Sequence, residues 1–303
     1  MPRHQSIRER IKSLIHPASA RPLPTPVPCM NCGHRFAVFQ GTKVVPDFDT
    51  SEVLPPELQL AFSERMDGIC SGCGIYQAYK RFTLDELRLI NSLGKDITTS
   101  EKAFQSFPVP AEFIERFNRL YFSKRLDEWR RYFLRIGIRP ASCLFIRSYF
   151  GATASFMQNE FGSAVAGVDM SPACLRTASE TVHGFKPLPG IINGMLEGEF
   201  LDSGPYDGIF VMHTLTHACD VHKMLGQMRG LLKPDGFVLF SHEVNRKPTN
   251  PFHMIHLSET QLRSLLLQHF ARADRIDDCD ENAPKFITNY TLHGDSPDLV
   301  AWK

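Results

Sequence analysis

The sequence lacks the features that mark membrane proteins and nucleic-acid-binding proteins. It contains no apolar run near the roughly 18 residues that a membrane-spanning helix requires. Its acidic and basic side chains nearly cancel, leaving a formal net charge of +1, so no strong field draws the chain toward nucleic acid or an anionic membrane. The basic N-terminal segment "MPRHQSIRERIKSLIHP" lacks the apolar core of a secretory signal. We therefore expect a cytoplasmic protein with no membrane span and no nucleic-acid partner.

The composition that is present is that of a globular protein. Hydrophobic residues make up 43% of the chain and charged residues 22%, enough for a sizeable core without disulfide staples. A length of 303 residues suggests more than one domain. We expect a basic helix and proline-rich linker at 1–28, a cysteine module at 29–80, a helical connector at 81–138 and an α/β domain at 139–303. The basic helix is either an ordinary surface helix or one that binds a partner or a membrane surface.

Four of the eight cysteines form two Cys-x-x-Cys pairs. Cys29 and Cys32 lie in "CMNCGH", and Cys70 and Cys73 lie in "CSGCGI". A glycine follows each pair and permits the tight turn that aims two thiolates at one ion. Without an export signal, such pairs indicate metal binding before disulfides. We predict a closed, structural zinc site with four cysteine ligands. Redox-active thiols, chance matches, and His34 replacing one cysteine are the alternatives.

Strands and helices alternate after Arg139-Pro140, which predicts a doubly wound, mostly parallel sheet covered on both faces. The expected strands are "SCLFI", "AVAGVDMS", "YDGIFVMH", "FVLFSHE" and "DLVAWK", with "KPDG" as a turn. The expected helices are "ATASFMQNEFG", "PACLRTASET" capped by Ser171, "DVHKMLGQMRGLL", and "SETQLRSLLLQHF" capped by Ser258. Upstream, "FTLDELRLINSLG" predicts a helix from near Thr83 to Gly94, and "AEFIERFNRLYFSKRLDEWRRYFLRIG" predicts a long helical segment.

The segment "YDGIFVMHTLTHACDVHKMLGQMRGLLKPDGFVLFSHE" resembles the second half of class I S-adenosylmethionine-dependent methyltransferases. The matching positions are His213, Leu215, His217, Asp220, Leu232, Lys233, Pro234 and Gly236. The resemblance covers about residues 115 to 303 and implies a seven-stranded, Rossmann-like methyltransferase fold that uses S-adenosylmethionine. With the metal-binding segment ahead of it, the chain also resembles sugar C-methyltransferases that act on nucleotide-linked deoxysugars. In those proteins the metal module helps to frame the sugar-nucleotide site.

The first loop of the predicted sheet departs from the pattern of that family, which is roughly acidic-x-Gly-x-Gly-x-Gly. In "LFIRSYFGATASF", Phe145 takes the acidic place, and Arg147 and Tyr149 take the first two glycine places. Only the last glycine is kept, as Gly151. The cofactor-binding candidates are Arg147, Tyr149, Gly151, Asp169, Met195 and His213.

These candidates allow three outcomes at the loop. S-adenosylmethionine still binds through backbone groups and Asp169, which can accept ribose hydroxyls. Alternatively, Arg147 serves a different or larger anionic ligand at the helix N-terminus. In the third outcome, bulky side chains close the pocket and the domain is a non-catalytic scaffold or partner subunit.

Histidines cluster at the expected strand ends and suit proton transfer near neutral pH. The catalytic candidates are His213, His217, His242 and His256. His217 is the first of them, as a substrate-side base or hydrogen-bond donor. A catalytic metal at His253 and His256 is an alternative. We predict a methyltransferase for a small polar substrate, with a nucleotide-linked sugar as one candidate; a protein partner is expected for the non-catalytic alternative.

Overall fold

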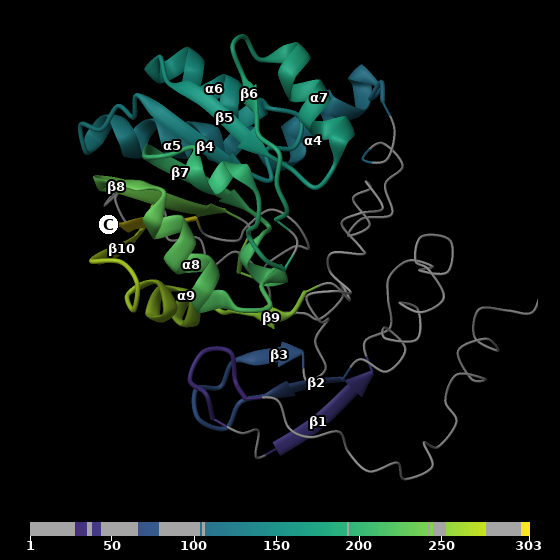
Figure 1. Ribbon diagram of the computed structural model, residues 1–303, viewed down its shortest axis with the longest axis vertical. Coiled ribbons are helices and arrows are strands. Elements are labelled where there is room, and N and C mark those ends of the chain that lie inside the picture. Colours follow the sequence, from purple (N-terminus) through teal and green to yellow (C-terminus); the bar gives the residue numbers. More distant parts are fainter. Residues whose placement is uncertain are drawn as a thin grey trace, which may run out of the picture.

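The computed structural model describes residues 28–34, 38–43, 66–78, 104, 107–192, 194–241, 243–244, 253–276 and 298–303. Two sheets lie within these residues, a large one above and a small one below in Figure 1. The predicted basic helix, proline-rich linker and Thr83–Gly94 helix lie outside the described residues. No helix in the described part has the length and apolar character that crossing a membrane requires.

The large sheet has seven strands in the order β10-β11-β8-β7-β4-β5-β6. Its strands are β4 Ser142–Ile146, β5 Ala164–Val168, β6 Lys186–Pro187, β7 Tyr206–Met212, β8 Leu232–Ser241, β10 Arg272–Arg275 and β11 Leu299–Trp302. The strands from β6 to β8 pair in parallel, whereas β11 is antiparallel to both β8 and β10. This confirms the predicted Rossmann-like methyltransferase fold. One local expectation was wrong, because "KPDG" belongs to β8, whose register with β7 shifts between Tyr206 and Gly208.

The helices that cover the large sheet begin and end largely as predicted. They are α4 Ala111–Tyr121, α5 Ser123–Arg135, α6 Ala152–Phe161, α7 Pro172–Thr181, α8 Val221–Gly230 and α9 Glu259–Leu266. The Ser171 hydroxyl accepts the backbone N–H of Cys174, and Ser258 forms a capping box with Gln261. The long helical segment is two helices instead of one, because the buried Phe122 leaves helical backbone geometry at φ −122°.

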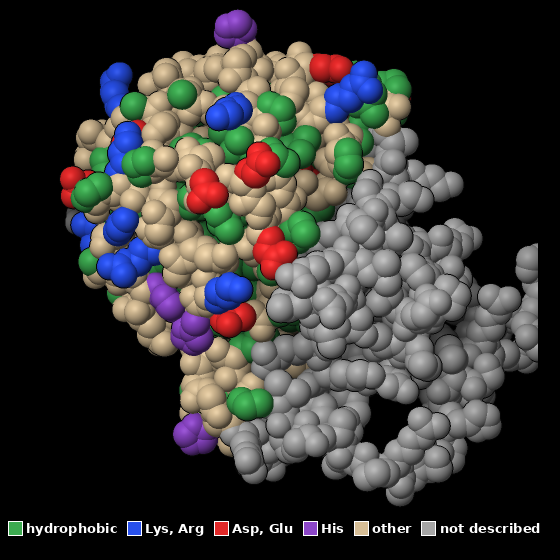
Figure 2. All heavy atoms as spheres, viewed as in Figure 1, with side chains coloured by type: hydrophobic (Ala, Val, Ile, Leu, Met, Phe, Trp, Pro, Cys, Tyr) green, Lys and Arg blue, Asp and Glu red, His purple; other side chains and the backbone are tan. Residues whose placement is uncertain are grey.

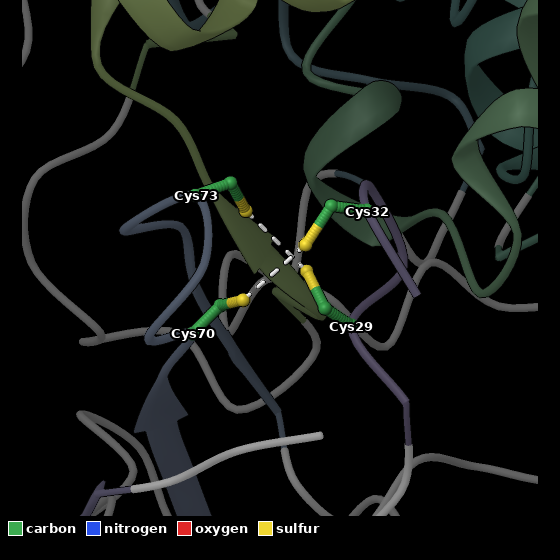
Figure 3. Close-up of side chains that lie close together, drawn as sticks. All are labelled: Cys29, Cys32, Cys70 and Cys73. Atoms are coloured by element: carbon green, nitrogen blue, oxygen red, sulfur yellow. Dashed lines mark hydrogen bonds between the residues drawn. The ribbon is translucent and has the colours of Figure 1, made fainter. Parts of the chain in front are cut away.

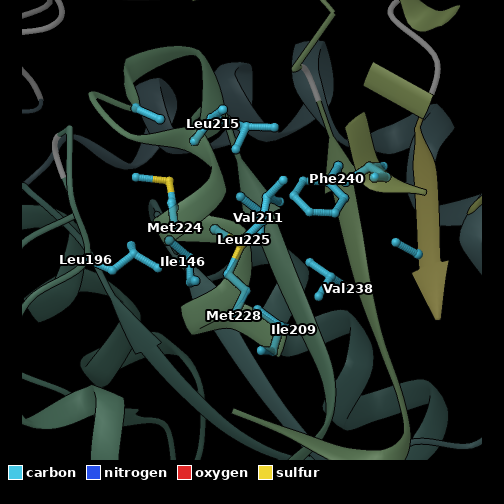
Figure 4. Close-up of a cluster of buried hydrophobic side chains, with 14 of the residues drawn as sticks. Ile146, Leu196, Ile209, Val211, Leu215, Met224, Leu225, Met228, Val238 and Phe240 are labelled. Carbon is cyan, nitrogen blue, oxygen red and sulfur yellow. The ribbon is translucent and has the colours of Figure 1, made fainter. Parts of the chain in front are cut away.

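Side chains alternate between the two faces of the large sheet and build a core on each. Ile146, Ile209 and Val211 point toward α8, where they meet Met224 and Leu225 (Figure 4). The intervening residues, such as Phe145 and Phe210, point to the other face and pack with Trp129 and Phe133 of α5. Successive side chains of a strand point to opposite faces of the sheet, so a strand covered on both faces places apolar residues in both cores. Phe145 therefore lies in the core, with its ring stacked 4.9 Å from that of Phe210.

The small sheet contains a strand from the far end of the chain. Its order is β1-β2-β3-β9, with β1 Val38–Lys43, β2 Met66–Ile69, β3 Tyr76–Ala78 and β9 Ile255–His256. The Ala78 N–H donates to the Met254 carbonyl at 2.8 Å, and the Met254 N–H donates to the Thr216 carbonyl at 2.7 Å. The small sheet, whose strands flank the second cysteine pair, is thus connected through Met254 to the loop after β7.

The surface carries charges of both signs. Figure 2 shows Lys and Arg side chains as well as Asp and Glu on the visible face, with apolar side chains between them. Neither sign covers this face, as the net charge of +1 leads one to expect.

Candidate functional site

The four paired cysteines converge on one point (Figure 3). Their Sγ atoms all lie within 4.8 Å of one another, and the Cys29–Cys73 and Cys32–Cys70 Sγ pairs are each 3.5 Å apart. A tetrahedral zinc ion with Zn–S bonds of about 2.3 Å requires sulfurs about 3.8 Å apart, so this donor set fits zinc. His34 is not a member of this four-residue cluster.

The two cysteine turns have the same backbone geometry. The Gly33 N–H donates to the Cys29 carbonyl at 3.0 Å, and the Gly74 N–H donates to the Cys70 carbonyl at 2.8 Å. Both glycines have positive φ, 71° and 69°, a conformation that costs glycine little. In each turn a backbone N–H also points at the first sulfur, as from Asn31 to Cys29 Sγ at 3.4 Å. Such donors stabilise the thiolates that a metal ion binds.

The thiols of the cluster differ in their affinity for protons. Burial raises the pKa of Cys29 well above its usual range. Burial also acts to raise the pKa of Cys70, but the backbone N–H groups of Cys73 and Gly72, together with hydrogen bonds from the Cys32 and Cys29 side chains, outweigh it and lower that pKa to about 7. Because a metal ion binds thiolates, its binding must displace the proton that the buried Cys29 retains.

The candidate cofactor and catalytic residues gather at the carboxyl ends of the parallel strands, where α/β folds bind ligands. Arg147 and Tyr149 follow β4, and Asp169 follows β5. His213 and His217 follow β7, and Glu243 follows β8. His242 lies outside the described residues.

The loop after β4 keeps a left-handed backbone despite its unusual residues. Arg147 has φ 64° and Tyr149 has φ 49°, and the facing His213 has φ 45°. A left-handed conformation costs a non-glycine residue about 1–2 kcal/mol. Gly151, at φ 85°, is also confined by packing, since a Cβ there would lie 2.8 Å from Val182 Cγ2. The loop therefore has glycine-type backbone geometry at positions where Arg and Tyr stand.

The side chains of Arg147 and Tyr149 both reach across to the loop after β7. Arg147 is 6% exposed, and its Nη1 donates to the His213 carbonyl at 2.9 Å and lies 3.3 Å from His217 Nε2. Tyr149 is also 6% exposed, and its Oη lies 3.1 Å from His213 Nδ1. The Arg147 guanidinium lies over the Tyr149 ring, 5.2 Å from its centre. Both side chains thus cover the backbone of this loop and reach the carboxyl end of β7.

Asp169 uses its carboxylate to hold the same loop. One oxygen accepts the backbone N–H of Tyr149 at 2.8 Å, and the other accepts that of Ser171 at 2.9 Å. Its side chain is buried, as is that of Met195. Asp169 therefore fixes the loop after β4 and the start of α7 together.

A row of aromatic rings runs from Arg147 to the small sheet. The ring of His217 packs edge-on against His253 with centres 4.9 Å apart, and His253 is 5.8 Å from His256. Tyr76 of β3 meets His256 edge-on at 5.2 Å. The structure thus brings three histidines of the sequence analysis side by side, with His217 and His256 buried.

Glu243, which the sequence places at the end of β8 but not among the catalytic candidates, also belongs to this site. It is 1% exposed, and its carboxylate accepts the backbone N–H of Thr214 at 2.6 Å and that of Thr216 at 3.1 Å. Burial raises the pKa of Glu243 to about 7, although these N–H donors and the Arg147 charge act to lower it. The signal available in the sequence was an acidic residue two positions after the end of the strand "FVLFS".

A second histidine pair, which the sequence did not indicate, ties the first cysteine turn to the large domain. His222 Nδ1 lies 2.7 Å from His269 Nε2, and His222 Nε2 lies 3.0 Å from the Asn31 carbonyl oxygen. Burial lowers the pKa of His269, and the nearby His222 and Arg229 lower it further. The pair connects α8 and the turn after α9 to the cysteine turn.

Part of the chain matches a known family of domains. The sequence profile of a family described as "Methyltransferase domain" matches residues 149–240, from the loop after β4 into β8. No curated protein matches the chain.

The fold is similar to that of several solved methyltransferase structures. Magnesium protoporphyrin IX methyltransferase from Synechocystis, with bound S-adenosylmethionine, is 13% identical over 73% of this chain and 98% of that chain, with a TM-score of 0.47. The 1,6-didemethyltoxoflavin-N1-methyltransferase of Burkholderia thailandensis, with bound S-adenosylhomocysteine, is 16% identical over 80% and 96%, with a TM-score of 0.44. An S-adenosylmethionine-dependent methyltransferase from Archaeoglobus fulgidus is 16% identical over 64% and 100%, with a TM-score of 0.45. The described large sheet has the Rossmann-like methyltransferase fold, and residues 149–240 match a methyltransferase domain.

Proposed function

We propose that the protein is an S-adenosylmethionine-dependent methyltransferase for a small polar substrate. The observation that carries this proposal is the left-handed backbone at Arg147 and Tyr149, at the start of residues 149–240, which match a methyltransferase domain. Strained backbone concentrates at functional sites, where the surrounding structure imposes it. The residues that would surround the cofactor come from the loops after the parallel strands. They are Arg147, Tyr149, Gly151, Asp169, Met195 and His213.

The cofactor would supply the methyl group, which is bound to its sulfonium. The residues of the chain would orient the substrate and accept or donate its proton. For the cofactor to lie on the loop backbone, Arg147 and Tyr149 must give up their contacts with His217 and His213. The buried His217 and His256, with His253 between them, line the side on which the substrate would lie. A nucleotide-linked sugar is the candidate substrate, because the chain, with its cysteine module ahead of the α/β domain, resembles sugar C-methyltransferases.

The cysteine cluster is proposed to hold one structural zinc ion. Cys29, Cys32, Cys70 and Cys73 fill a tetrahedral coordination sphere, which leaves no position for a reacting water or substrate. Zinc there would stabilise the two turns and the small sheet and would take no part in methyl transfer.

A second candidate function is a non-catalytic methyltransferase fold that serves as a scaffold or partner subunit. It is favoured by the inward contacts of Arg147 and Tyr149 and by Asp169, whose two oxygens each accept a backbone N–H. In this candidate the chain's own side chains take the place of the cofactor.

Calorimetric titration of the zinc-loaded full chain with S-adenosylmethionine and S-adenosylhomocysteine separates the two candidates. Saturable micromolar binding of either compound supports the enzyme, and Asp169→Asn should then weaken it. Asp235→Asn is the matched control, because Asp235 is exposed near the start of β8, away from the strand carboxyl ends. No binding at millimolar concentration, with the fold intact, refutes the enzyme and supports the scaffold.

A further inference from the structure

The contact between Arg147 and His217 determines where His217 carries its proton. A guanidinium group has only N–H donors, so any hydrogen bond that it makes needs an acceptor on the other side. Arg147 Nη1 lies 3.3 Å from His217 Nε2 in a buried environment. Nε2 must therefore present its lone pair, which leaves the single proton of a neutral imidazole on Nδ1.

The surrounding contacts keep the His217 ring in this orientation. Glu243 accepts the N–H groups of Thr214 and Thr216 and so fixes the turn that precedes His217. On the other side of the turn, the Thr216 carbonyl accepts the Met254 N–H at 2.7 Å. The ring itself packs edge-on against His253 and is 2% exposed, so it has little room to rotate.

We propose that Arg147 is a positioning residue that, in the protein without cofactor, holds His217 as the neutral Nδ1–H tautomer, so that Nε2 cannot act as a base while Arg147 donates to it. A cofactor that displaces Arg147, as the proposed function requires, would free Nε2. The consequence for catalysis rests on the proposed function, whereas the tautomer is a property of the protein without ligand.

The test is nitrogen NMR of the zinc-loaded full chain labelled with ¹⁵N-histidine, without any ligand. His217 is assigned by the signals that disappear in His217→Gln. We expect a protonated Nδ1 and an unprotonated Nε2 across about pH 6–8, the range in which free imidazole titrates. Arg147→Lys, which keeps a cationic donor, should preserve this pattern, whereas Arg147→Met should give a mixture of both tautomers. Arg176→Met, on the exposed face of α7, is the matched control and should change nothing.

Two results would overturn the proposal. One is a proton on Nε2 of His217 in the wild-type protein, and the other is a wild-type pattern in Arg147→Met. If Arg147→Met does not fold, the wild-type protein and Arg147→Lys decide the question. Failure of S-adenosylmethionine to bind would refute the enzyme but would leave the tautomer unchanged, so the two failures are distinguishable.

Discussion

Replacing Arg147 by glycine should strengthen cofactor binding, although it removes a buried charged side chain. In the wild-type protein a cofactor must displace the charge-assisted hydrogen bond from Arg147 to the His213 carbonyl and the cation–π contact with Tyr149. A hydrogen bond from a charged group contributes about 1.5–3 kcal/mol, and a desolvated cation–π contact such as this buried one about 2 kcal/mol. Rehydration of the freed guanidinium offsets part of this, which leaves a displacement cost of about 2–3 kcal/mol.

Since about 1.4 kcal/mol corresponds to a tenfold change in affinity, Arg147→Gly should bind S-adenosylhomocysteine roughly 30- to 140-fold more tightly. Glycine also removes about 1–2 kcal/mol of left-handed strain at φ 64°, which offsets part of the stability lost with these contacts. Calorimetry gives the dissociation constants, and urea unfolding verifies the fold. Arg147→Lys keeps most of the bulk and the charge and should not gain affinity. Equal dissociation constants for the wild-type protein and Arg147→Gly would show that Arg147 does not obstruct the site.

Three further predictions concern the metal, the loop and pH. Metal analysis should find about one zinc per chain, and Cys73→Ser should reduce it while Cys219→Ser, outside the cluster, should not; an intact fold with no zinc would refute the site. Gly151→Ala should lower the free energy of unfolding by about 1–3 kcal/mol more than Gly162→Ala, because both have positive φ but only Gly151 is crowded; equal losses would contradict the packing argument. Because burial raises the pKa of Glu243, its contribution to stability is fully present below about pH 4.5 and is lost as pH rises through about 7. The free energy of unfolding of the wild-type protein relative to Glu243→Gln should therefore fall by up to about 3 kcal/mol between pH 5 and 8; a difference independent of pH would argue against this.

Local signals in the sequence predicted the elements of the large sheet well. "SCLFI" and "AVAGV" are apolar runs of strand length, and Ser171-Pro172 and Ser258 mark helix starts that the structure confirms. Local signals did not predict the boundaries of elements that are set by packing between distant parts of the chain. Phe122 interrupts a continuous helical pattern because its ring is buried, and β6 and β10 are short strands that pairing with their neighbours defines.

The sequence predicted where the candidate site residues lie but not the directions in which their side chains point. The strand ends fixed the neighbourhood of Arg147, Asp169 and His217, because parallel strands bring their carboxyl ends to one edge. Whether Arg147 points toward this edge or away from it depends on acceptors such as the His213 carbonyl, far along the chain. The same limit applies to Glu243, whose partners are backbone N–H groups that the sequence does not display.

The membership of β9 in the small sheet affects how the protein is made. Ribosomes release the cysteine turns and β3 early, but β9 becomes available only after residue 256 has left the exit tunnel. Until then the edge of β3 that carries Tyr76 and Gln77 has no β9 to pair with. The small sheet is therefore completed only after most of the methyltransferase fold has been synthesised, so a nascent chain stalled before β9 would expose a strand edge to other nascent chains or to chaperones.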